Sequence, residues 1–169
     1  APRTNKRSDE YGGSAENRRR FVLEVYDEIR RRVGDDFPVS IKLNSADFQK
    51  GGFTEEESLA VVEALDARGI DLIEISGGTY EAPRMAGQGQ RESTRRREAY
   101  FLSYAEQVRS RVKVPLMVTG GFRSREGMAA ALEDGATDVI GLARPLVLDP
   151  AFSNRLLAGE DAVSAVAPI

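Results

Sequence analysis

The sequence reads Val114-Pro115-Leu116-Met117-Val118-Thr119 and then Gly120-Gly121-Phe122-Arg123-Ser124, so a run of β-forming residues meets a pair of glycines. Such a run, bounded by glycines, predicts a buried β-strand that ends in a tight turn. Ser124 can cap a helix that we expect to continue through Leu132 and to end at Gly135. The stretch therefore predicts a strand, a turn and a helix in succession.

The same alternation of strand and helix extends in both directions along the chain. Further strands are expected over residues 38–43, 70–76 and 137–142, and further helices from Ser14, from Thr54, from near Ser93 and over about residues 150–158. Residues 1–13 are polar and are expected to form a loop or tail. A helix followed by repeated β-α pairs requires a parallel sheet with right-handed crossovers.

The fold class is therefore α/β, with four strands that form either half of a (β/α)₈ barrel or a small open sheet. The half-barrel is favoured because no dinucleotide-binding glycine fingerprint follows the first strand. We treat residues 1–169 as a single domain.

The composition narrows the function classes. The net charge of −3 and the pI near 5.2 give no electrostatic reason to expect nucleic acid or an anionic membrane as a partner, so a small molecule is expected. No apolar stretch reaches the ~18–20 residues of a membrane span, and the first residues lack the apolar core of a signal peptide. These features predict a cytoplasmic protein.

The chain has no cysteine and no histidine. Disulfides and thiolate chemistry are excluded, the commonest general acid or base near neutral pH is missing, and we expect no metal site. Asp47, Glu74 and Glu81 lie near strand ends and are candidate acids or bases.

The glycine pair is a candidate phosphate site. Backbone N–H groups of Gly120 and Gly121 could approach a phosphate, aided by the positive end of the helix that starts near Ser124. Arg144, just after the next strand, could add a charge-assisted contact. Many (β/α)₈ barrels build such a site after their last two strands. The alternative is that the glycines serve only a turn and that Arg144 is a solvated surface charge.

Two other cationic features have two interpretations each. Lys42, at the end of the first strand, could stabilise the negative charge that develops on a reduced flavin ring or an enolate, or it could extend to solvent or pair with Glu74. The basic run from Arg91 to Arg97 could bind an anion or form the exposed start of a helix.

Six short motifs follow one another along the chain: Asp9–Arg18, Ile41–Phe48, Glu74–Gly78, Glu98–Phe101, Thr119–Phe122 and Gly141–Pro145. In this order they resemble the Old Yellow Enzyme family of NADH:flavin oxidoreductases. The resemblance implies the second half of a TIM barrel. It also implies an FMN enzyme that accepts hydride from NADH or NADPH and reduces an activated alkene, a quinone or another electron-poor acceptor.

Carried over by position, Gly120, Gly121 and Ala143 would offer N–H groups to the FMN phosphate, and Arg144 would add charge. Lys42 would face N1 and the C2 carbonyl of the flavin, where the family usually has arginine. The resemblance implies that the family's substrate-anchoring His/Asn or His/His pair, its proton-donating tyrosine and the residue that tunes the flavin near N5 belong to the first four strands, so no catalytic residue is assigned in this chain. We expect the chain to pair with the missing N-terminal half-barrel or to self-associate, and to be inactive alone.

Two alternatives stay open at this point. The chain could be a non-catalytic half-barrel that binds a phosphorylated ligand or acts as an assembly module, because an open half-barrel exposes two strand edges. It could also belong to another FMN barrel of the dihydroorotate dehydrogenase type, which shares the phosphate loops.

Overall fold

A computed structural model describes residues 1–84 and 98–165. Four parallel strands form one sheet in the order β1-β2-β3-β4. The strands are β1 (Ser40–Asn44), β2 (Leu72–Ser76), β3 (Leu116–Thr119) and β4 (Val139–Gly141). Because each strand pairs with the next in sequence, the described sheet has no point at which strand order reverses, as it would in a doubly wound sheet. The predicted parallel α/β fold is confirmed.

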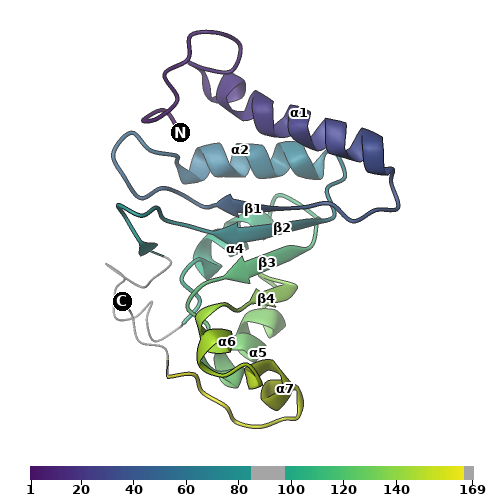
Figure 1. The fold of residues 1–169 in the computed structure, drawn as a ribbon, viewed down its shortest axis with the longest axis vertical. Coiled ribbons are helices and arrows are strands. Elements are labelled where there is room, and N and C mark those ends of the chain that lie inside the picture. Colours follow the sequence, from purple (N-terminus) through teal and green to yellow (C-terminus); the bar gives the residue numbers. More distant parts are fainter. Residues whose placement is uncertain (85–97, 166–169) are drawn as a thin grey trace.

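Helices separate the strands and cover the sheet (Figure 1). Their bounds are α1 (Ala15–Val33), α2 (Glu55–Asp66), α4 (Leu102–Arg109), α5 (Arg125–Glu133), α6 (Arg144–Leu148) and α7 (Phe152–Leu157). Figure 1 shows α1 and α2 side by side next to β1, and all four strands pointing to the same edge of the sheet. None of the helices in the described ranges is long and apolar enough to cross a membrane.

One face of the sheet forms the core beneath these helices. Ile73, Ile75, Leu116 and Val118 are at most 1% exposed and belong to one buried apolar cluster with side chains of α2 and α4. Burying each such side chain stabilises the fold by roughly 1.5–3 kcal/mol. Because side chains alternate along a strand, the residues between them occupy the opposite face of the sheet. That face carries the polar residues of the strands.

Local signals set the starts of three helices as predicted. The Ser14 hydroxyl accepts the N–H of Asn17, and the Ser124 hydroxyl accepts the N–H of Gly127. Thr54 and Glu57 form a complete capping box at the start of α2. Glu57 also pairs with Arg18 of α1, which fixes the start of one helix against the other.

Other boundaries differ from the prediction. The last predicted helix, over about residues 150–158, is confirmed as α7, whereas the short helix α6 before it was not predicted. Pro150 lies between the two, and proline lacks the N–H that would continue a helix. The helix predicted from near Ser93 would include residues 98–101, but these lie before α4, and Ala99 among them is buried. On α1 the residues packed in the core are Leu23 and Tyr26, whereas Val25 and Ile29 are about 40% exposed.

Candidate functional site

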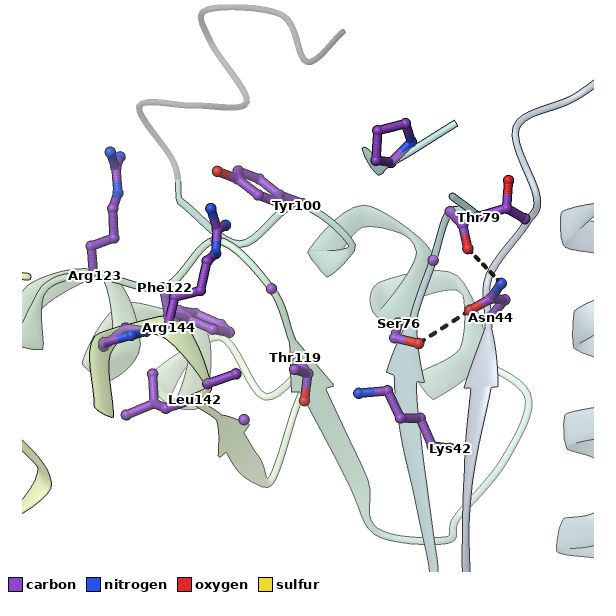
Figure 2. Close-up of a pocket in the computed structure, with 18 of the residues that line it drawn as sticks. Lys42, Asn44, Ser76, Thr79, Tyr100, Thr119, Phe122, Arg123, Leu142 and Arg144 are labelled. Atoms are coloured by element: carbon purple, nitrogen blue, oxygen red, sulfur yellow. Dashed lines mark hydrogen bonds between the residues drawn. The ribbon is translucent and has the colours of Figure 1, made fainter. Parts of the chain in front are cut away.

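A pocket of about 460 Å³ lies at the carboxyl edge of the sheet and is lined by residues at the ends of all four strands and in the loops after them (Figure 2). Parallel strands bring their carboxyl ends to one edge, where α/β proteins bind ligands. The structure places in its lining the five residues predicted to bind the cofactor: Lys42, Gly120, Gly121, Ala143 and Arg144. Gly121 and Arg144 therefore lie at the same edge, as a shared phosphate site requires.

The turn after β3 depends on its glycines. Gly120 and Gly121 have φ values of 123° and 94°, a region that other residues rarely adopt. A Cβ atom on Gly121 would overlap the carbonyl oxygen of Glu98. The N–H of Tyr100 donates to the carbonyl of Gly120 at 3.0 Å, so the segment that precedes α4 holds the turn from one side.

The carboxylate of Glu98 occupies the approach to α5. One of its oxygens accepts the N–H groups of Arg123 and Ser124 at 2.7 and 3.0 Å. The side chain is buried, and a Cβ on Gly127 would contact the same carboxylate. The sequence predicts that the start of this helix assists the binding of a phosphate. In the structure a carboxylate takes that place, so the glycine turn and the loop after β4 carry the candidate phosphate site.

The loop after β4 supplies the second half of the candidate phosphate site. Ala143 precedes α6 and its carbonyl accepts the N–H of Leu146 at 3.0 Å, which fixes the backbone beside the pocket. Arg144 follows as the first residue of α6, and Figure 2 shows its side chain and that of Arg123 extending in the same direction, away from the strands. Two guanidinium groups thus stand at the β3 and β4 end of the pocket.

Thr119 and Gly141 are register partners on the pocket floor. Gly141 leaves room for Thr119, because a Cβ at position 141 would overlap the threonine hydroxyl. That hydroxyl is buried and, within residues 1–84 and 98–165, has no hydrogen-bond partner. A buried polar atom without a partner costs about 1–3 kcal/mol. Such an atom is typical of a site that holds a ligand or a water molecule.

The β1 and β2 end of the pocket carries a charge pair and a polar network. Lys42 Nζ lies 2.7 Å from Glu74 Oε1, so the pairing that the sequence left open is present. Asn44 donates to the carbonyl of Gly78 at 2.9 Å and accepts from the Ser76 hydroxyl at 3.3 Å (Figure 2). These bonds tie the two strand ends together beside Lys42.

Several lining residues are not among those predicted from the sequence. Asn44 and Ser76 could have been found, because polar residues at the ends of predicted strands are the signal that selected Lys42. Tyr100 and Arg123 could not, because nothing local shows that the start of α4 folds over the glycine turn.

The candidate acids and bases do not line the described pocket. The Asp47 carboxylate accepts the N–H of Phe53 at 2.9 Å and so stabilises its own loop. Backbone hydrogen bonding and contacts with Thr79 and Gln49 lower the pKa of Glu81, which favours an ionised surface carboxylate. Glu74 reaches the site only through Lys42.

Two further predictions concern a metal site and the basic run. Over the described ranges, no group of three or more acidic side chains is placed to hold a metal ion. The run Arg91 to Arg97 lies outside the described residues.

Comparison with known proteins gives a family match over most of the chain. Residues 1–161 match the model of the NADH:flavin oxidoreductase / NADH oxidase family. An NADH-dependent flavin oxidoreductase of Talaromyces variabilis is 41% identical over 91% of this chain, and one of Hypocrea jecorina is 38% identical over 92%. The chain spans only 38% and 40% of the length of these two proteins.

Solved structures agree with this match. The chain superposes on a 2-naphthoyl-CoA reductase complex with a TM-score of 0.83 and 30% identity, covering 96% of this chain and 25% of that one. It superposes on morphinone reductase with a TM-score of 0.64 and 27% identity, covering 95% and 40%. The four parallel strands correspond to part of the barrel of these enzymes. The chain therefore belongs to the NADH:flavin oxidoreductase / NADH oxidase family, that of Old Yellow Enzyme, and forms a portion of its TIM barrel.

Proposed function

We propose that this chain is the FMN-binding part of an NADH- or NADPH-dependent oxidoreductase that passes hydride through FMN to an electron-poor acceptor, such as an activated alkene or a quinone. The observation that carries the proposal is that Gly120, Gly121, Ala143 and Arg144 line one pocket with Lys42. Family membership supports the redox class. Relatives named for cinnamate, bilirubin or 2-naphthoyl-CoA reduction illustrate the range of acceptors.

The charge, size and backbone of the pocket support a phosphorylated ligand. Its described lining includes Lys42, Arg123 and Arg144 and no carboxylate, although the whole chain has a net charge of −3. Its volume of about 460 Å³ lies within the ~300–1,000 Å³ usual for cofactor sites. The glycine turn lets the backbone approach a phosphate, and the buried Thr119 hydroxyl without a partner marks a polar floor.

Some residues of the chain would bind the FMN phosphate, and others would tune the chemistry of the flavin ring. Gly120, Gly121 and Ala143 would donate backbone N–H groups to the FMN phosphate, and Arg144 would add a charge-assisted contact. Lys42 would lie toward the ring and favour negative charge on it. Bound FMN would supply the hydride-transfer chemistry. Acceptor anchoring and proton donation would fall to the remainder of the parent barrel, so this chain alone would be inactive.

The test compares FMN with riboflavin, which has the same ring but no phosphate. Binding to the apoprotein, followed by quenching of flavin fluorescence, should be tighter for FMN. Arg144→Gln should weaken FMN binding by about tenfold, the value of one charge-assisted hydrogen bond, and leave riboflavin binding unchanged. Arg155→Gln is the matched control, because Arg155 pairs with Asp149 and Glu160 outside the pocket. Equal affinity for the two flavins would overturn the proposal.

The alternative function is a non-catalytic module that binds phosphorylated ligands in general. The exposed apolar side of α1, with Phe21 65% exposed, favours an assembly role. If the chain is such a module, inorganic phosphate would compete with FMN as strongly as analogues that keep the flavin ring do. The parent protein purified from cells would then release no yellow chromophore on denaturation.

A further inference from the structure

The geometry of the Lys42–Glu74 pair is more constrained than that of an ordinary surface ion pair. The two residues are direct register partners on β1 and β2, and Lys42 Nζ lies 2.7 Å from Glu74 Oε1. Both side chains are on the sheet face opposite the apolar core, with Lys42 51% and Glu74 21% exposed. Rigid strands hold both backbones, so the position of the ammonium group is set by its carboxylate partner.

Only the lysine of this pair reaches the pocket. Lys42 lines it, whereas Glu74 is not among its described lining residues. An ammonium group has three donors, and one of them is directed to Glu74. The remaining donors can face a ligand. Glu74 therefore acts on whatever occupies the pocket through Lys42.

The other cations of the pocket lie at its opposite end. Arg123, which follows β3, and Arg144, the first residue of α6, lie on the β3 and β4 side (Figure 2). At the β1 end, Glu74 offsets the charge of Lys42. The carboxylate therefore acts on the cation at this end of the pocket.

We propose that Glu74 is a positioning residue that orients Lys42 toward the flavin ring and limits how strongly this lysine favours the reduced cofactor. The inference rests on the proposed function. A reduced ring carries more negative charge than an oxidised one, so Lys42 stabilises the reduced form preferentially. Glu74, held against the lysine, weakens that preference and sets the balance between accepting and delivering hydride.

The experiment measures the dissociation constants of oxidised and reduced FMN, anaerobically, in the intact protein that carries this chain. Their ratio reports the preference for the reduced form independently of turnover. Glu74→Gln keeps the shape of the side chain and should shift the ratio toward reduced FMN by about three- to fivefold, the scale of a partly exposed ion pair. Lys42→Met should shift it in the opposite direction. Because Glu74 acts through Lys42, the effect of Glu74→Gln should shrink in the Lys42→Met background.

Two controls separate this role from a structural one. Asp27→Asn removes the same charge from the pair of Asp27 and Arg68, which lies outside the pocket, and should leave the ratio unchanged. Glu74→Asp keeps the charge, and its ratio should stay close to that of the unmodified protein. It also provides a folded variant if the glutamine variant is unstable.

The outcomes distinguish the two proposals. If Lys42→Met shifts the ratio and Glu74→Gln behaves like Asp27→Asn, the role of Glu74 is overturned and the flavin function stands. If the unmodified protein binds neither form of FMN, the proposed function itself fails.

Discussion

Gly121 shows how one residue links the fold to the candidate site. Its φ of 94° and its close approach to the Glu98 carbonyl both require the absence of a side chain. Gly135 has a similar φ of 73°, but a Cβ there would meet nothing within 4 Å. Substitutions at these two glycines therefore distinguish the cost of backbone strain from the cost of close packing.

Gly121→Ala should destabilise the protein by clearly more than Gly135→Ala, for which about 1 kcal/mol of strain is expected. The excess is the cost of displacing the Glu98 backbone, and it should be accompanied by weaker FMN binding. Urea unfolding of both variants measures the difference. Equal losses in the free energy of unfolding would show that the turn tolerates a side chain.

Thr119 and Gly141 make a second prediction at the residue scale. Gly141→Ala places a methyl group against the Thr119 hydroxyl and should cost about 1–3 kcal/mol by overpacking. Thr119→Ala in the same protein should recover part of this loss, because it removes the obstructing atom. A double-mutant cycle from thermal unfolding tests the coupling, and simple additivity of the two changes would contradict it.

The capping box at the start of α2 contributes measurably to the free energy of unfolding. Thr54 and Glu57 satisfy each other's backbone donors, whereas the Ser14 cap of α1 provides one bond from a side chain. Thr54→Ala should lower the free energy of unfolding by about 1 kcal/mol, and Ser14→Ala by less. Urea denaturation compares them, and a larger effect at Ser14 would argue against the reciprocal box.

Tyr104 of α4 gives a pH dependence of stability. Burial raises the pKa of Tyr104 to about 12, above the value of 10.0 expected in the unfolded chain. The folded protein therefore retains this proton while the unfolded chain loses it. The contribution of Tyr104 is fully present below pH 10 and is lost as the pH rises from 10 to 12.

Tyr104→Phe tests that contribution, because phenylalanine fills the same space and does not ionise. The free energy of unfolding of the unmodified protein should fall more steeply between pH 10 and pH 12 than that of the variant. Parallel curves for the two proteins would show that burial of the phenol has no effect on its ionisation.

At the scale of the whole molecule, one side of α1 remains apolar and exposed. Phe21, Val25, Ile29 and Val33 are 40–65% exposed, and a groove of about 730 Å³ runs beside the first three of them. Exposed apolar surface of this kind favours association. We infer that, in the chain on its own, this side of α1 contacts a second copy of the chain.

Expressed alone, the 169-residue chain should self-associate in sedimentation experiments. Ile29→Glu should increase the fraction of monomer, because it places a charge within the apolar side of α1. Leu132→Glu, on an exposed position of α5, is the matched control and should have no such effect. A chain that is monomeric at all concentrations would contradict the inference.

The sequence by itself determined the features that neighbouring residues encode. The order of strands and helices, the caps at Ser14, Thr54 and Ser124, and the glycine turn after β3 all follow from short patterns whose conformational preferences are local. Parallel topology then placed Gly121 and Arg144 at one edge, because strands connected by helices must all point the same way. The residues of the candidate phosphate site could therefore be predicted from the sequence.

Only the tertiary structure decided which residues meet across long stretches of chain. The Glu98 carboxylate takes the amides at the start of α5, Lys42 pairs with Glu74, and Val25 and Ile29 of α1 remain exposed while Leu23 is buried. Each outcome depends on which elements pack together, and an apolar helical repeat does not specify which of its residues will be covered. These pairings arise from the packing of the whole molecule, because contact energies between distant residues leave no signature in the local sequence.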